Sequence, residues 1–157
     1  MAKSIPNIES YSPETFKAEV KAYKSKGGEE TPCFELKLYI NGHFAATVKN
    51  HGTGGHNIYH WENATLKSIF DRHIQHLISQ GKFKFDFEQN DEYIEELIEE
   101  FELKKWCKKL TVIKLKSHKD GEYLQLGQTY SSSVKEYVIN KFGDDLAEII
   151  NERFILA

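Results

Sequence analysis

The feature that most constrains the fold is the alternation of apolar and polar residues on both sides of Asn41–Gly42. Before this pair, the apolar residues Phe34, Leu36, Leu38 and Ile40 alternate with Cys33, Glu35, Lys37 and Tyr39, and after it come Phe44, Ala46 and Val48. A period of two is typical of a half-buried β-strand. Asn-Gly is a favoured hairpin turn. These residues therefore predict a β-hairpin with one buried face.

The register of this hairpin depends on the length of its loop. A two-residue loop pairs Ile40 with His43 and puts Phe44 on the face of Tyr39. A three-residue loop pairs Tyr39 with His43 and sets Leu38 opposite Phe44. We expect the three-residue loop, because it places the apolar residues of both strands on one face.

Helical spacing of apolar residues recurs elsewhere in the chain. It predicts helices at residues 12–25, from a cap at Asn63 to Gly81, from a cap at Asn90 or Asp91 to Trp106, at residues 131–142, and from Asp144 or Asp145 to Phe154. A second hairpin is predicted at residues 110–126, with its turn at Asp120–Gly121. Between two of the helices, Phe83, Phe85 and Phe87 alternate with polar residues, which predicts an extended segment whose aromatic face must be covered.

These elements predict an α+β fold: an antiparallel sheet built from two hairpins, with helices packed on one face. The length of 157 residues is typical of one domain, and we expect residues 1–157 to form one. A hairpin followed by a helix occurs twice. This order suggests a ββα repeat with halves at residues 33–80 and 110–157.

Composition narrows the classes of function. The net charge of −3 lacks the basic excess that binding to phosphate backbones usually leaves in a sequence, so we do not expect generic nucleic-acid binding. DNA mimicry by the glutamates that follow Asp91 is disfavoured by the lysines at the end of the same helix. This order of charges complements the helix dipole and explains the charge run without a partner. No apolar stretch is long enough to span a membrane, and we expect a cytoplasmic protein.

The segment from His51 to Trp61 is the main candidate for a functional site. Its predicted ligand-binding residues are Gly52, Thr53, Gly54, Gly55, His56 and Asn57. Glycines allow the backbone to approach a ligand closely, and the polar side chains supply donors, a combination that suits an anion or a nucleotide. No known phosphate-loop motif is present. The alternative interpretation is a connection that uses glycine for tight turns.

His51, His56 and His60 are open to two further interpretations. They could transfer protons on a phosphoester, because histidine titrates near neutral pH, or they could bind a metal ion. Their spacing matches no known metal motif, and no nucleophile motif occurs in the chain. We therefore predict no catalytic residue, no metal and no cofactor, with these histidines as the alternative. His73, on an apolar helix face, is predicted to be a hydrogen-bonded core residue.

Two stretches carry a resemblance. Residues from Tyr39-Ile40-Asn41-Gly42 through the His51–Trp61 segment, with the ending from Phe142-Gly143-Asp144-Asp145 to Asn151-Glu152-Arg153, resemble small uncharacterised proteins of bacteriophages and mobile genetic elements. The resemblance implies a genomic setting in which small proteins often inhibit host defence. We therefore expect a non-enzymatic binding protein that acts on a host protein, with loop 51–61 near its contact surface. The alternative is a small nucleotide-binding protein or phosphohydrolase that uses this loop to hold phosphate.

Overall fold

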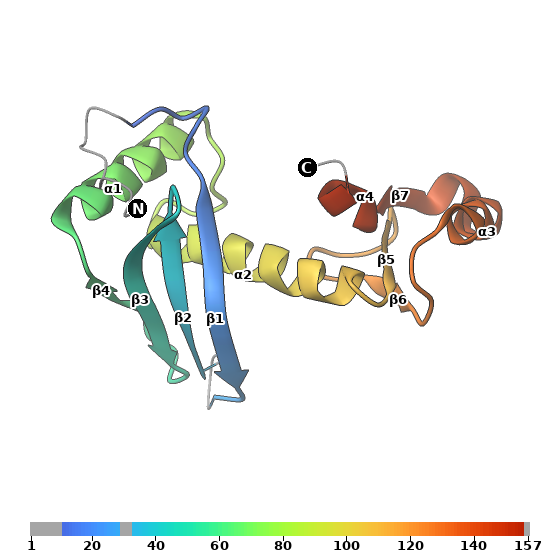
Figure 1. Cartoon of the computed structure of the whole chain (residues 1–157), viewed down its shortest axis with the longest axis horizontal. Helices are drawn as coiled ribbons and strands as arrows, with labels where there is room; N and C mark the ends of the chain where they lie inside the picture. The colour runs from blue at the N-terminus through green and yellow to red at the C-terminus, as the bar shows by residue number, and fades with distance from the viewer. Residues whose placement is uncertain (1–10, 29–32, 156–157) are drawn as a thin grey trace, which may run out of the picture. The chain divides into compact units, whose positions relative to one another are not determined.

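The computed structural model describes residues 11–28 and 33–155 and shows an α+β chain of antiparallel sheets and helices (Figure 1). The elements are β1 (Ala18–Lys26), β2 (Cys33–Ile40), β3 (His43–His51), β4 (Ile58–Trp61), α1 (Ala64–Ser79), α2 (Gln89–Cys107), β5 (Thr111–Leu115), β6 (Leu124–Leu126), α3 (Ser132–Phe142), a 3-10 turn (Gly143–Asp145), β7 (Leu146–Ile149) and α4 (Asn151–Ile155). The chain divides into two compact units, and the division falls between Ile98 and Glu99, inside α2.

The predicted α+β class with antiparallel strands is confirmed, but the prediction of one shared sheet is wrong. The first unit holds a four-stranded sheet in the order β1-β2-β3-β4, and the second holds a three-stranded sheet in the order β6-β5-β7. The two predicted hairpins therefore lie in separate sheets. A hairpin followed by a helix does occur in residues 33–80 and in residues 110–157, although the strand orders differ. The ββα repeat and the single domain over residues 1–157 stay predictions.

The first hairpin turns through two residues, so the predicted three-residue loop is wrong. Asn41 and Gly42 both have positive φ, 50° and 83°, as the tight hairpin turn requires. Ile40 pairs directly with His43. A two-residue turn fits the twist of the flanking strands better than a longer loop.

A β-bulge in β3 brings Ala46 and Val48 onto the face of Leu38 and Leu36, while Phe44 stays on the face of Tyr39. Tyr39 pairs with Phe44, but Leu38 pairs with Ala46, so Ala45 is the extra residue. Beyond the bulge Leu36 and Leu38 of β2 pair with Val48 and Ala46 of β3, and all four are fully buried. The short turn and the shared apolar face are thus compatible, because one extra residue restores the alternation.

The helix predicted at residues 12–25 is wrong, because most of this segment forms β1. This strand pairs antiparallel with β2, and a bulge interrupts the register at Ala22, which has φ 52°. The extra residue puts Val20 and Tyr23 on the same face although they lie three positions apart. Val20 is buried, and the ring of Tyr23 contacts that of Phe34. A bulged strand therefore shows the spacing expected of a helix.

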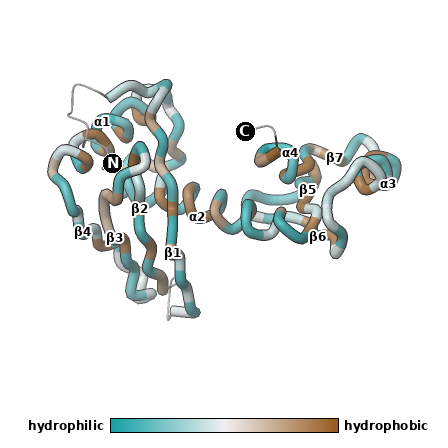
Figure 2. Tube along the Cα trace, in the orientation of Figure 1, coloured by the Kyte–Doolittle hydropathy of each residue, from teal (hydrophilic) through white to brown (hydrophobic). Residues whose placement is uncertain are grey.

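Helix α1 covers the buried face of the first sheet, as its apolar stripe predicts. The Asn63 side chain caps it by accepting a hydrogen bond from the backbone N–H of Leu66. The ring of Phe70 lies 5.2 Å from that of Trp61 in β4. His73 is buried and forms a 2.9 Å hydrogen bond with the Tyr11 hydroxyl, which confirms it as a core residue. Apolar and polar residues alternate along the strands beneath the helix (Figure 2).

In the second unit, α3 begins at the predicted serine cap and ends at Gly143, but the last predicted helix is wrong. Its first half forms β7, where Leu146 pairs with Leu115 and Ile149 pairs with Ile113. The strand has one residue more than its partner, so two residues three positions apart again share a face. This is the same effect as in β1. Only Asn151–Ile155 are helical.

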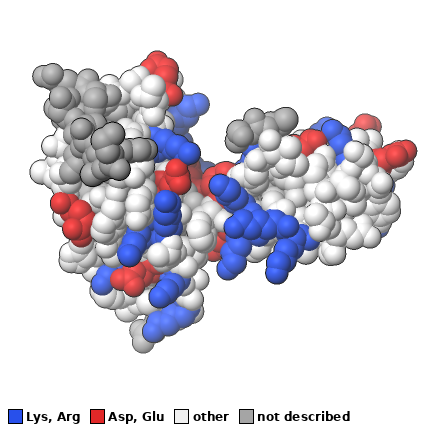
Figure 3. All heavy atoms as spheres, in the orientation of Figure 1, with Lys and Arg blue, Asp and Glu red and all other residues white. Residues whose placement is uncertain are grey.

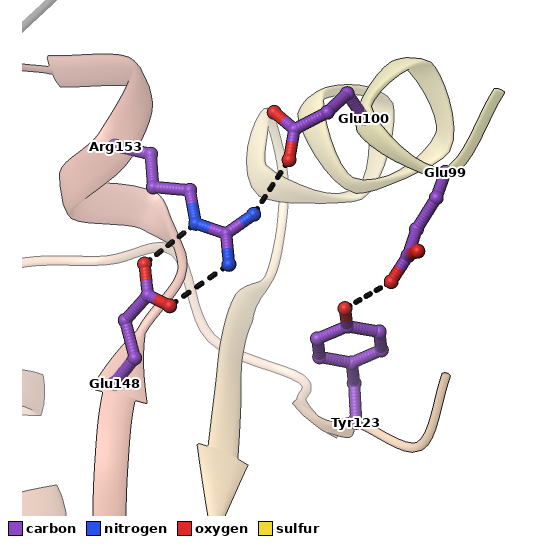
Figure 4. Close-up of polar contacts among 5 residues, drawn as sticks. All are labelled: Glu99, Glu100, Tyr123, Glu148 and Arg153. Atoms are coloured by element: carbon purple, nitrogen blue, oxygen red, sulfur yellow. Dashed lines mark hydrogen bonds and ion pairs between the residues drawn. The ribbon is translucent and has the colours of Figure 1, made fainter. Parts of the chain in front are cut away.

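Polar contacts tie the ends of this unit together (Figure 4). The guanidinium of Arg153 donates two hydrogen bonds to Glu148, of 2.6 and 2.8 Å, and a third of 2.6 Å to Glu100. The hydroxyl of Tyr123 donates to Glu99. Hydrogen bonding to Glu148 raises the pKa of Arg153 above its usual value. The cluster connects α2, β7 and α4 and is most simply structural.

Asn151 joins backbone segments by hydrogen bonds inside the core of the same unit. It is 2% exposed, its Oδ1 accepts from the Val112 N–H at 2.8 Å, and its Nδ2 donates to the Leu110 carbonyl at 2.8 Å. The side chain thus replaces strand pairing at the point where β7 gives way to α4. Buried backbone groups would otherwise lack partners.

We predict that Asn151→Ala lowers the free energy of unfolding by about 2 to 4 kcal/mol, because Val112 and Leu110 both lose a buried hydrogen-bond partner. Urea denaturation followed by circular dichroism measures the change. The control is Asn140→Ala on the exposed face of α3, for which a change within about 0.5 kcal/mol is expected. Equal effects of the two substitutions would contradict the role given to Asn151.

Candidate functional site

The glycine-rich loop between β3 and β4 is closed by its own hydrogen bonds. The side chain of Asn50 accepts from the Gly52 N–H at 2.8 Å and donates to the Gly55 carbonyl at 3.1 Å and to Asn57 Oδ1 at 3.0 Å. Asn50 and Asn57 are both buried. Gly52 adopts φ 78° and Gly54 φ 87°, a region that glycine enters without strain. Part of the glycine content therefore serves the shape of the loop.

A carboxylate of α2 fixes the far end of this loop. Asp91 accepts hydrogen bonds from the Asn57 N–H at 3.0 Å and from the Tyr59 hydroxyl at 2.7 Å. Burial, and then the bond to Asp91, raises the pKa of Tyr59 well above its usual value, so this hydroxyl stays protonated as a donor. Asp91 lies in the first turn of α2, where the helix dipole favours a negative charge.

The predicted ligand-binding residues fall into two groups. Gly52 and Asn57 are buried, and their amides donate within the protein to Asn50 and Asp91. Residues 53–56, which are Thr53, Gly54, Gly55 and His56, form the exposed tip of the loop. Only this tip presents its surface to a ligand or to another protein.

The three candidate histidines do not come together. His51 ends β3, and His60 in β4 pairs with Thr47, so the two lie on one face of the sheet but four residues apart, about 13 Å at the usual rise of a strand. His56 lies on the loop tip. Over residues 11–28 and 33–155, no group of three or more His, Cys, Asp or Glu side chains is placed to hold a metal ion.

The segment with three phenylalanines forms a second exposed loop, which we call the aromatic loop (residues 83–88). Phe85 and Phe87 are 56% and 59% exposed, and their ring centroids lie 5.4 Å apart. The prediction that this aromatic face is covered is wrong for these two rings within the described part of the chain. Glu92 accepts from the backbone N–H groups of Lys84 at 2.9 Å and Phe85 at 3.2 Å. The loop is therefore fixed while its rings are exposed.

The glycine-rich loop and the aromatic loop share one anchor. Asp91 holds the first and Glu92 holds the second, and these two residues are consecutive in the first turn of α2. The sequence alone gives only a weak sign of this arrangement, because both acids also suit a helix start without any partner. Sequence reasoning missed Asp91 and Glu92 as the residues that position both loops.

A hollow of about 320 Å³ lies at one end of the first sheet, next to the start of the glycine-rich loop. Its lining includes Lys24, Lys26, Lys49 and His51, with Glu35 as the acidic member. Lys49 and Glu35 form an ion pair of 3.3 Å. Lys24 and Lys26 give the hollow a positive character, which suits a small anion.

Comparison with protein-family models, with curated proteins and with solved structures finds no match for this chain. The site is therefore interpreted from its own residues. None of the helices in the described ranges combines the length and the apolar character needed to cross a lipid bilayer.

We predict that Asp91→Ala loosens the glycine-rich loop, because the Asn57 amide and the Tyr59 hydroxyl lose their acceptor. Hydrogen exchange of the amides in residues 52–57 should become at least about tenfold faster, since each lost bond to a charged group is worth roughly 1.5 to 3 kcal/mol. The control is Asp86→Ala, which removes an exposed carboxylate elsewhere in the same unit. Unchanged exchange in Asp91→Ala would show that the loop holds its shape alone.

Proposed function

We propose that this chain is a non-enzymatic binding protein that modulates a partner protein, and that its contact surface comprises the aromatic loop and the exposed tip of the glycine-rich loop. The exposed pair Phe85 and Phe87 carries the proposal. Large aromatic side chains that remain exposed are enriched at protein interfaces, where burying them supplies much of the binding free energy.

The anchoring of these loops supports the same proposal. Because Glu92 accepts two backbone hydrogen bonds from the aromatic loop, the two rings are presented on a fixed backbone. Preorganised contact residues lose less conformational entropy when a partner binds. The tip at residues 53–56 is fixed through Asp91 in the adjacent position of α2.

The nature of the partner rests on the sequence resemblance alone. Small proteins of bacteriophages and mobile elements often inhibit factors of their host. We propose a host protein, such as a component of a defence system, as the partner, with the host cytoplasm as the place of action.

We predict that the double substitution Phe85→Ser/Phe87→Ser abolishes capture of the partner from a bacterial lysate, because it removes the exposed aromatic surface. Capture on immobilised protein, followed by mass spectrometry, measures the result. The matched control is Tyr137→Ser, which removes an aromatic residue that is 50% exposed in the second unit. A partner that binds wild type and Phe85→Ser/Phe87→Ser equally well would contradict the proposal.

A companion variant tests the glycine-rich tip in the same capture experiment. Gly55 is the suitable position, because a Cβ placed there meets nothing within 4 Å. Gly54, with φ 87°, would be strained by any side chain. Gly55→Arg should therefore fold normally and weaken capture by steric conflict. Full capture by a normally folded Gly55→Arg would remove residues 53–56 from the contact surface.

The positive hollow beside His51 favours a second candidate function, the binding of a small nucleotide. We predict that a nucleotide at about 100 times its dissociation constant stabilises the protein by about 2.7 kcal/mol, which a rise in melting temperature reports. Lys24→Gln/His51→Gln should remove this rise, and hydrolysis of the nucleotide would extend the function to a phosphohydrolase. No rise with any nucleotide in a cyclic and linear panel would refute this candidate.

A further inference from the structure

The outer surface of the first sheet, which we call the open face, carries a concentration of lysines. Helix α1 packs on the opposite face, where Leu36, Leu38, Ala46 and Val48 are fully buried. The strand pairings place five lysines together on the open face: Lys21, Lys24, Lys26, Lys37 and Lys49. In the described parts of these strands, the acidic residues on the open face are Glu19 and Glu35. In Figure 3, blue spheres of basic residues lie along the first unit with red spheres of acidic residues between them.

The fold places basic and acidic residues of the first unit on different surfaces, which the net charge of the whole chain does not reveal. The net charge of −3 argues against binding to nucleic acid. Many of the acids of the first unit lie instead in residues 86–96, which run through the aromatic loop into α2. The open face therefore has a positive local field, and a local field governs the attraction of a charged partner.

Two of these lysines lie opposite each other, and each contacts an aromatic ring, which offsets part of the repulsion between them. Lys21 and Lys37 are direct partners across β1 and β2, and like charges in such a position destabilise a sheet. Each ammonium group lies over an aromatic ring of the same face: Lys21 Nζ is 4.3 Å from the centre of Tyr39, and Lys37 Nζ is 5.7 Å from that of Phe44. Paired cations beside paired rings are the groups that hold a phosphate backbone and stack its bases.

We propose that the open face binds single-stranded nucleic acid. Bases stack on Tyr39 and Phe44 and displace the two ammonium groups, which then contact phosphates. The hollow beside Lys24, Lys26 and His51 continues the positive track along the strands. The face does not enter the major groove of a duplex, because four strands span about 14 Å before side chains are added, more than the roughly 12 Å of that groove. An acidic protein segment would use the lysines but not the rings.

The test measures the anisotropy of a labelled oligothymidylate of about 20 nucleotides, longer than the roughly 4 to 16 nucleotides that a small binding domain occupies. Lys21→Gln/Lys37→Gln should weaken binding at least about tenfold and reduce the slope of log affinity against log salt by about 1.4, since each phosphate contact on a single strand contributes about 0.7. Tyr39→Leu/Phe44→Leu should weaken binding at least about fivefold and leave this slope unchanged.

The matched control is Lys104→Gln/Lys105→Gln, which removes the same charge from exposed positions of α2 in the second unit and should leave binding unchanged. Circular dichroism melting checks that each variant folds. If Lys21→Gln/Lys37→Gln does not fold, Lys24→Gln/Lys26→Gln replaces it and carries the same expectation. The probes for comparison are a duplex of equal length, polyglutamate and a mononucleotide.

Four results would overturn the proposal. The first two are no binding of the oligonucleotide at low salt and tighter binding of the duplex than of the oligonucleotide. The others are polyglutamate that binds as tightly as the oligonucleotide and is unaffected by Tyr39→Leu/Phe44→Leu, and a mononucleotide that binds as tightly as the oligomer. The last result would assign the hollow to a small nucleotide instead. The open-face variants are also tested for capture of a partner protein. If they lose oligonucleotide binding but keep full capture, the nucleic-acid surface is distinct from the contact surface proposed above.

Discussion

Both units of the chain depend on the same helix for their cores. Near its start, α2 contributes the buried residues Tyr93 and Ile94 to the first unit. Further along, Leu103 packs with Val112 and Ile150 in the second. Asp91 and Glu92 in its first turn hold the glycine-rich loop and the aromatic loop. The helix that completes the first core therefore also positions these two exposed loops. A helix of 19 residues can do this because its faces and ends carry different side chains.

The first unit presents two surfaces of different chemistry. The loops anchored on α2 offer exposed aromatic rings, whereas the open face offers lysines beside half-buried rings. One surface suits a folded partner and the other a flexible polyanion.

Local signals explain what the sequence could predict. The Asn41–Gly42 turn, α1 with its Asn63 cap, the second hairpin and α3 all follow from short-range patterns, and all are present. The strands β1 and β7 were mistaken for helices because a bulge in each converts a period of two into spacings of three. A bulge depends on the partner strand, which no local pattern contains. The anchoring of both loops by Asp91 and Glu92 was missed for the same reason, since those contacts join residues distant in sequence.

The lysines and the bulge of β1 also affect the tendency of the protein to associate with other copies of itself. Among the described residues this strand is an edge of its sheet, and backbone groups at a sheet edge can pair with the edges of other copies. Charged side chains and the kink at Ala22 make such pairing unfavourable. The lysines that we propose for binding of nucleic acid therefore also disfavour pairing between sheet edges.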